Sequence, residues 1–208
     1  PIMKTPIEVF SDWAKDGRDE KMAQGHALSV NAMLDYVLNK LPKAFTFIDA
    51  GCGNGWVVRK VGDKNSCEKA IGIDGSKSMI EKAKSLDKQN DYYCKNLMNW
   101  TPSQKVDCVF SMEVFYYVEK PNLLIDNIFS NWLKKNGRLI MGIDYYIENK
   151  SSQGWQSDCG ISVMTRLTES QWIENFKLSG FEEVHSWRQG ERKNWSGTLI
   201  VAGKKTSN

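Results

Sequence analysis

The sequence has few of the residues from which common metal sites and disulfide frameworks are built. It contains two histidines and five cysteines, and no two cysteines form a Cys-x-x-Cys pair. Structural and catalytic metal sites of the common type use clusters of these residues, so no metal site is predicted. The odd cysteine count argues against a disulfide framework and favours a reducing, cytoplasmic location.

Long apolar runs and strong charge are also missing. No apolar run approaches the roughly 18–20 residues that cross a bilayer, and no basic segment followed by an apolar one opens the chain. The net charge is +3, and the basic residues are scattered. We therefore expect neither a membrane nor a nucleic acid as a partner.

The 208 residues, of which 41% are apolar, suit one domain with a full hydrophobic core. Patterns of strands and helices alternate along the chain. Expected strands cover 44–50, 69–74, 91–94, 106–112, 138–143, 182–188 and 198–202. Expected helices cover 7–41, 56–61, 122–133 and 168–178, together with a helix that Ser76 caps; Gly137 is expected to follow a helix end.

This alternation predicts an α/β fold, a Rossmann-like, doubly wound sheet in a single domain. The sheet should be mostly parallel, with an antiparallel pair of strands at the C-terminal end. Within the domain we expect an N-terminal helical lid at 1–42, a cofactor-binding core at 43–146, and a substrate loop with a C-terminal helix and strand pair at 147–208.

A glycine turn follows the first expected strand. Gly51, Gly53 and Gly55 come directly after an apolar run, and the next strand ends in Asp74. In parallel sheets, ligands bind at the carboxyl ends of the strands, where glycines let the backbone approach a ligand. Asp74 could accept hydrogen bonds from both hydroxyls of a ribose, so a nucleoside cofactor is predicted.

Two kinds of cofactor compete for this turn. A dinucleotide site favours the spacing Gly-x-Gly-x-x-Gly, whereas here Trp56 follows Gly55. Asp49, two residues before the first glycine, would repel a pyrophosphate but could help to hold an ammonium group. The turn therefore favours a cofactor with an amino-acid tail, and NAD remains an alternative.

Several motifs in the right order resemble class I S-adenosylmethionine-dependent methyltransferases that act on small molecules. The resemblance covers about 26–203, and its motifs lie at 47–55, 71–84, 106–113 and 133–139. It implies S-adenosylmethionine as cofactor and S-adenosylhomocysteine as product. The family usually has an acid where Asn96 stands. The implied cofactor-binding residues are Asp49, Gly51, Cys52, Gly53, Gly55, Asp74, Gly75, Met79, Asn96, Leu97, Ser111 and Met112.

Candidate catalytic residues follow the fourth and fifth strands or lie in the first helix. A methyl acceptor that carries a proton needs a base. The candidates are His26, Glu113, Tyr116, Tyr117 and Tyr145, with Asp144, Tyr146 and Glu148 nearby in the sequence. A lone histidine is more often structural than catalytic, and the two tyrosines at 116–117 could equally be packing residues. His185 is expected to be structural.

The sequence therefore predicts methyl transfer to a small-molecule acceptor by in-line displacement. The alternatives are a module that binds S-adenosylmethionine without turnover and an NAD-dependent oxidoreductase. The loop at 145–166 is expected to determine specificity, since residues that recognise substrates tend to lie on loops. Eight tryptophans, Trp13 and Trp155 among them, could line a pocket for an apolar or cationic molecule. The acceptor, the attacked atom and the oligomeric state stay open.

Overall fold

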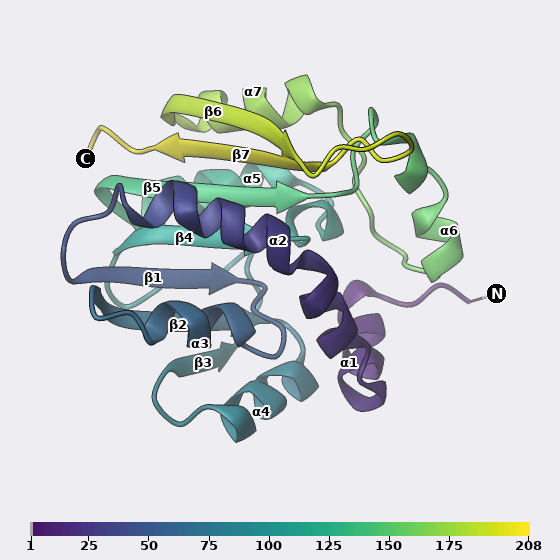
Figure 1. Cartoon of the computed structure of the whole chain (residues 1–208), viewed down its shortest axis with the longest axis horizontal. Coiled ribbons are helices and arrows are strands. Elements are labelled where there is room, and N and C mark those ends of the chain that lie inside the picture. Colours follow the sequence, from purple (N-terminus) through teal and green to yellow (C-terminus); the bar gives the residue numbers. More distant parts are fainter. Residues whose placement is uncertain (1) are drawn as a thin grey trace.

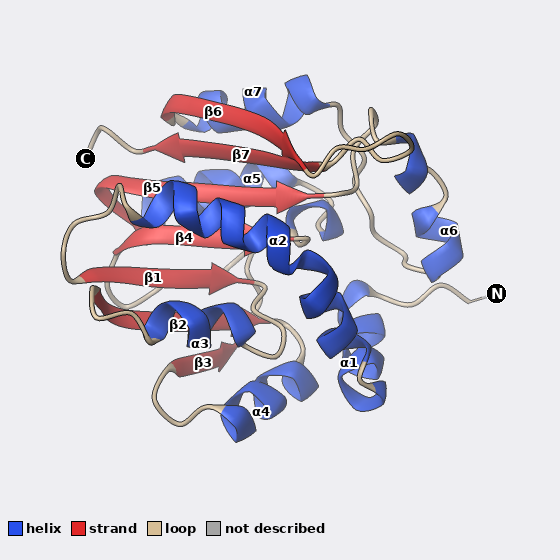
Figure 2. Cartoon of the chain, viewed as in Figure 1, coloured by secondary structure: helices blue, strands red, loops and turns tan. Residues whose placement is uncertain are grey.

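A seven-stranded sheet runs through the computed structural model, which describes residues 2–208 (Figures 1 and 2). The strand order is β3-β2-β1-β4-β5-β7-β6. The first five strands are parallel, and β7 is antiparallel to both β5 and β6. The strands are β1 (Phe45–Ala50), β2 (Cys67–Asp74), β3 (Asp91–Cys94), β4 (Val106–Met112), β5 (Leu133–Ile143), β6 (Glu182–Gln189) and β7 (Thr198–Lys204). The predicted fold class is confirmed.

Helices cover both faces of the sheet and give it two apolar layers. One layer packs the sheet against α2 (Arg18–Leu38), α3 (Trp56–Gly62) and α4 (Lys77–Leu86). The other packs it against α5 (Pro121–Asn127) and α7 (Glu169–Ser179). Between residues 2 and 208, no helix combines the length and the apolar character needed to cross a membrane.

The N-terminal helix is broken where the sequence predicts one continuous helix over 7–41. Thr5 caps α1 (Pro6–Asp16), and Gly17 then adopts φ 79°, a left-handed conformation that ends α1 before α2 begins. The turn lets α1 lie beside α4, where the Ser11 and Ser76 hydroxyl oxygens are 2.7 Å apart. α2 ends at Leu38, not at Leu41. The break places α1 at the carboxyl edge of the sheet (Figure 1).

The chain between α5 and β5 also differs from the prediction. The regular helix ends at Asn127, and a π-helical turn, η2 (Ile128–Trp132), leads straight into β5. The expected helix-ending glycine, Gly137, instead lies within β5, beside a register shift between Val106 and Cys108 of β4. The carbonyls of Phe129 and Leu133 accept hydrogen bonds from the buried Lys205 ammonium, at 2.7 and 3.1 Å. This lysine satisfies the end of the helix in place of a glycine cap.

Three short helices surround the carboxyl ends of the strands. They are η1 (Phe115–Tyr117), η3 (Lys150–Ser152) and α6 (Trp155–Cys159). The segment after α6 is tied to the N-terminal segment, because the Lys4 N–H donates to the Gly160 carbonyl at 2.8 Å. The N-terminal segment and the segment after α6 therefore meet near the edge at which the parallel strands end.

Candidate functional site

A cleft opens at the carboxyl edge of β1, β2 and β4, beneath α1 and the first turns of α2. It has two adjoining parts. One part reaches the loop after β3, at Asn96 and Leu97. The other reaches His26 and Glu113. The residues common to both parts are Phe10, Gly51, Asp74, Val114 and Tyr117.

Two carboxylates lie at the centre of this cleft, the buried Asp49 and the half-buried Asp74. Asp74 accepts hydrogen bonds from the backbone N–H groups of Gly53, at 2.9 Å, and Ser76, at 2.8 Å. Burial raises the pKa of Asp74, while these two hydrogen bonds oppose the rise. For Asp49, burial and then the charge of Asp74 raise the pKa well above its ordinary value. Such a pair favours a bound group that carries positive charge or donates hydrogen bonds.

Two glycines of the turn, Gly51 and Gly53, are required for different reasons. Gly51 has φ 81°, and a Cβ there would lie 2.3 Å from a methyl carbon of Val114. Gly53 has φ 52°, and a Cβ there would meet no atom within 4 Å. Gly51 is therefore needed for packing, whereas Gly53 exposes open backbone to the cleft. An open turn beside Asp49 and Asp74 fits a nucleoside whose tail carries an ammonium group.

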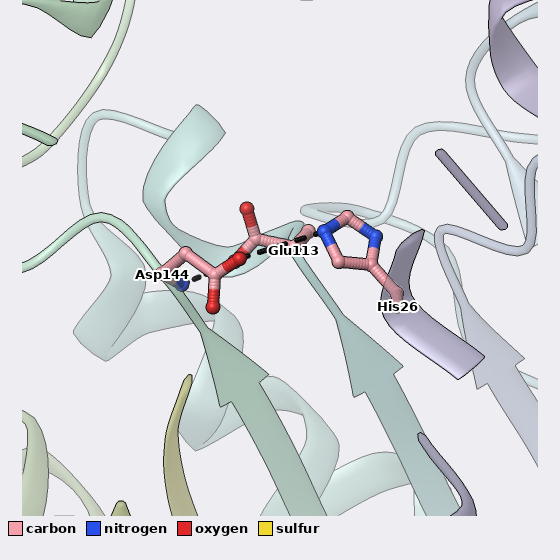
Figure 3. A group of neighbouring side chains, drawn as sticks. All are labelled: His26, Glu113 and Asp144. Carbon is pink, nitrogen blue, oxygen red and sulfur yellow. Dashed lines mark hydrogen bonds and ion pairs between the residues drawn. The ribbon is translucent and has the colours of Figure 1, made fainter. Parts of the chain in front are cut away.

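His26, Glu113 and Asp144 meet at the other part of the cleft (Figure 3). They come from α2, from the turn after β4 and from the residue after β5. His26 Nε2 lies 3.5 Å from Asp144 Oδ2, and the Asp144 backbone N–H donates to Glu113 Oε1. One polar atom from each residue lies within 4.8 Å of the others, a spacing that a metal ion could bridge. The three residues are far apart in the sequence, so the sequence did not indicate that they form one cluster.

Hydrogen bonds already engage the remaining carboxylate oxygens of the cluster. Asp144 Oδ1 accepts from the Thr198 hydroxyl at 2.6 Å, and Glu113 Oε2 accepts from the Tyr116 hydroxyl at 2.5 Å. The Tyr116 and Tyr117 hydroxyl oxygens are 3.3 Å apart. The arrangement is therefore a hydrogen-bonded network that can share protons across the cleft wall.

Burial and mutual charge set the proton affinities of this network. Burial, reinforced by the charge of Asp144, raises the pKa of Glu113 to about 8. Burial opposes the charged form of His26, but the hydrogen bond to Asp144 and the charge of Glu113 outweigh it, so the pKa of His26 is raised. Glu113 also has φ 60°, a strained backbone for a residue with a side chain. Shifted pKa values and local strain together are typical of functional sites.

Replacing Glu113 with glutamine is expected to stabilise the ligand-free protein, and more so as the pH rises. The pKa of Glu113 is raised in the folded protein, from 4.5 to about 8, so ionisation favours the unfolded chain throughout that pH range. Glutamine cannot ionise and escapes this loss. Thermal denaturation at the two ends of the range should show a growing advantage for Glu113→Gln. Glu174→Gln, on the exposed surface of α7, is the matched control, and an advantage independent of pH would contradict the assignment.

Most of the residues predicted from the sequence line this cleft. Three do not. Gly55 packs against the Tyr92 ring, Ser111 donates to the Ala50 carbonyl at 2.9 Å, and Tyr145 lies against Tyr116 with ring centres 5.2 Å apart. The predicted residues that line it are His26, Asp49, Gly51, Cys52, Gly53, Asp74, Gly75, Met79, Asn96, Leu97, Met112, Glu113, Tyr116 and Tyr117.

The N-terminal helices contribute lining residues that no sequence motif marked as part of the cofactor site or the reaction site. Phe10, Asp19 and Met22 face the cleft, and Trp13 joins them. Their position depends on the break at Gly17, which turns α1 over the edge of the sheet. The Thr5–Glu8 capping box and Gly17 were the available signals for two separate helices.

Comparison with known proteins identifies the central part of the chain. The family described as "Methyltransferase domain" matches residues 48–141, which run from β1 into β5. Trans-aconitate 2-methyltransferase from Agrobacterium fabrum is 29% identical over 100 residues, covering 48% of this chain and 36% of that protein. Malonyl-[acyl-carrier protein] O-methyltransferase 2 from Ilyobacter polytropus is 26% identical over 149 residues, covering 69% of this chain and 56% of that protein. The chain thus spans only part of the length of these relatives.

A solved structure is similar over nearly the whole chain. It is the methyltransferase in the complex with the Trm112 methyltransferase activator of Haloferax volcanii. The TM-score is 0.80 at 26% identity, and the match covers 95% of this chain and 98% of that one. Other structures with this fold, at lower identity, contain S-adenosylmethionine or S-adenosylhomocysteine.

Proposed function

Because the chain is a class I S-adenosylmethionine-dependent methyltransferase domain, we propose that it transfers the methyl group of this cofactor to a small-molecule acceptor. The cofactor supplies a methyl group already activated on a sulfonium sulfur. The protein must therefore position the reactants and exclude water. The main support for this proposal is that one cleft contains both the glycine turn and a wall formed by His26, Glu113, Tyr116 and Tyr117.

We assign the cofactor to the centre of the cleft and to the part that reaches the loop after β3. Asp74 would accept hydrogen bonds from the ribose hydroxyls, and Asp49 would face the ammonium group of the methionine tail. The loop after β3, with Asn96 and Leu97, would contact the adenine. The open backbone at Gly53 and the raised pKa of buried Asp49 support this assignment.

The roof of the cleft favours a small acceptor. α1 places Phe10 and Trp13 over the cleft, with their ring centres 5.2 Å apart. A macromolecular substrate would need an open approach at this edge and, for a nucleic acid, a basic surface. We propose that residues 1–42 act as a lid and that the loop within 147–208 contributes to acceptor specificity.

We propose that His26 acts as the base for an acceptor that must lose a proton. Asp144 faces Nε2, which fixes that nitrogen as the N–H donor and leaves Nδ1 with a free lone pair. Figure 3 shows the second ring nitrogen turned away from both carboxylates. Glu113, Tyr116 and Tyr117 would form the wall against which the acceptor lies.

The experiment is a transfer assay with S-adenosylmethionine that carries a labelled methyl group. The protein is incubated with a cell extract separated into small molecules, proteins and nucleic acids, and heat-inactivated protein serves as the control. We expect label in the small-molecule fraction together with S-adenosylhomocysteine. Label confined to protein or nucleic acid would contradict a small acceptor. Tight cofactor binding with no transfer to any fraction would favour the non-catalytic binding module.

A further inference from the structure

The acceptor side of the cleft is acidic. Asp19, Asp49, Asp74 and Glu113 line this part, and among its lining residues within 2–208 there is no lysine or arginine. Asp19 is neutralised by Lys82, whose ammonium lies 2.9 Å from Asp19 Oδ2. Asp49 and Asp74 are assigned above to the cofactor. Glu113 therefore remains as the carboxylate that faces an acceptor.

The charges around Glu113 come from three elements. Asp144 follows β5 and donates its backbone N–H to Glu113, while its carboxylate faces His26 of α2. Tyr116 and Tyr117 belong to η1 and are neutral phenols. Arg166 does not line this part of the cleft, and its guanidinium lies 5.8 Å from the centre of the Tyr145 ring. Among the described residues that line this part of the cleft, His26 is therefore the one basic side chain that can counter the carboxylates of Glu113 and Asp144.

Aromatic rings complete the acceptor side. The Phe10 ring meets Trp13 at 5.2 Å and Tyr117 at 4.8 Å, both edge to face, and Tyr117 lies 4.3 Å from Tyr116. Aromatic rings beside a carboxylate attract organic cations through the ring quadrupole and through charge. These rings carry no positive charge with which an acidic acceptor could pair. Burial and the charge of Asp144 raise the pKa of Glu113, and a bound cation would offset the charge of Asp144 and favour the ionised carboxylate.

We propose that the methyl acceptor is a small organic amine that carries an aromatic or apolar group and enters the cleft as an ammonium ion. The inference rests on the proposed methyl transfer and names its substrate class. Glu113 draws the ammonium group to the wall, and the rings of Phe10, Trp13 and Tyr117 surround its apolar part. A carboxylate of the same size would meet Glu113, and the basic side chain of this wall, His26, is already paired with Asp144.

The reaction needs one proton acceptor, and His26 of this wall can provide it. The ammonium group first gives a proton to His26 Nδ1 and regains a lone pair. The amine nitrogen then bonds to the methyl carbon as the carbon–sulfur bond breaks, and that electron pair stays on sulfur. Positive charge passes from sulfur to nitrogen, so the product is an N-methylammonium ion beside a neutral thioether.

The test compares two probes of nearly equal shape and opposite charge. 2-Phenylethylamine and 3-phenylpropionate are titrated by calorimetry into the protein loaded with S-adenosylhomocysteine. We expect the amine to bind at least about tenfold more tightly, the effect of one partly screened charge contact. Glu113→Gln should remove most of that preference, while the control Glu174→Gln, on the surface of α7, should retain it.

The possible results distinguish a failure of the proposed methyl transfer from a failure of the amine assignment. If the protein does not bind S-adenosylhomocysteine at all, the proposed function fails before the probes are added. If it binds S-adenosylhomocysteine but prefers the carboxylate, or fails to distinguish the two probes, only the amine assignment is overturned. A preference for the amine that survives Glu113→Gln would also overturn it, because the charge would then act from another residue.

Discussion

Replacing His26 with alanine is expected to lower kcat for methyl transfer by about 10²- to 10⁴-fold, the usual contribution of a positioned base. Asp144 holds one ring nitrogen and leaves the other free to take a proton. An ammonium acceptor has no lone pair until that proton leaves. The affinity for S-adenosylhomocysteine should stay close to that of the unaltered protein, since the cofactor is assigned to the other side of the cleft.

The pH dependence distinguishes a base from a structural histidine. The defect of His26→Ala should shrink as the pH approaches the pKa of the acceptor amine, because solvent then supplies the neutral amine. A defect that is the same at every pH would indicate a structural role. His185→Ala is the matched control. The His185 ring packs against both Tyr36 and Trp187, with ring centres 5.4 Å away in each case, and its loss should leave kcat unchanged.

The parallel strands could be predicted closely because buried strands leave a direct mark in the sequence. β3 and β4 have the predicted bounds, and the antiparallel pair at the C-terminal end is present. The residues at the ends of β1 and β2, among them Gly51 and Asp74, follow from the same signal. Strand ends in a parallel sheet converge on one edge, so a correct strand assignment also brings these residues together.

Each of the two errors in the helices can be traced to particular residues. Gly17 looks like a tolerated glycine within one amphipathic stretch, but its left-handed conformation splits the stretch in two. Gly137 looks like a helix cap, but Asn136 takes the positive φ, 65°, and Lys205 serves the carbonyls at the helix end. That lysine lies far along the sequence, so no local pattern could have indicated it.

The acceptor wall could be predicted only as a set of separate candidates. His26, Glu113 and Asp144 stand on three elements, and their contact depends on how α2 packs across the ends of β4 and β5. The same packing creates the shifted pKa values and leaves no lysine or arginine among the described residues that line the wall. Residue types in a sequence do not show which charges will share a cavity, so the preference for an amine becomes visible only in three dimensions.

Asp74→Ala is expected to weaken the binding of S-adenosylhomocysteine by about 1–3 kcal/mol, the cost of leaving buried hydroxyls without a partner. That corresponds to a loss of roughly 5- to 150-fold in affinity. Asp74 also accepts the N–H groups of Gly53 and Ser76, so its loss would loosen the glycine turn. Asp74→Asn keeps the size of the side chain but removes one acceptor and should lose affinity as well.

Calorimetric titration of S-adenosylhomocysteine into the unaltered protein, Asp74→Ala and Asp63→Ala tests the central claim most directly. Asp63, an exposed carboxylate at the far end of α3, is the matched control. We expect binding of one molecule per chain, a loss of affinity in Asp74→Ala within the range given above, and no change in Asp63→Ala. Equal affinities in all three proteins, or binding of NAD in place of S-adenosylhomocysteine, would contradict it.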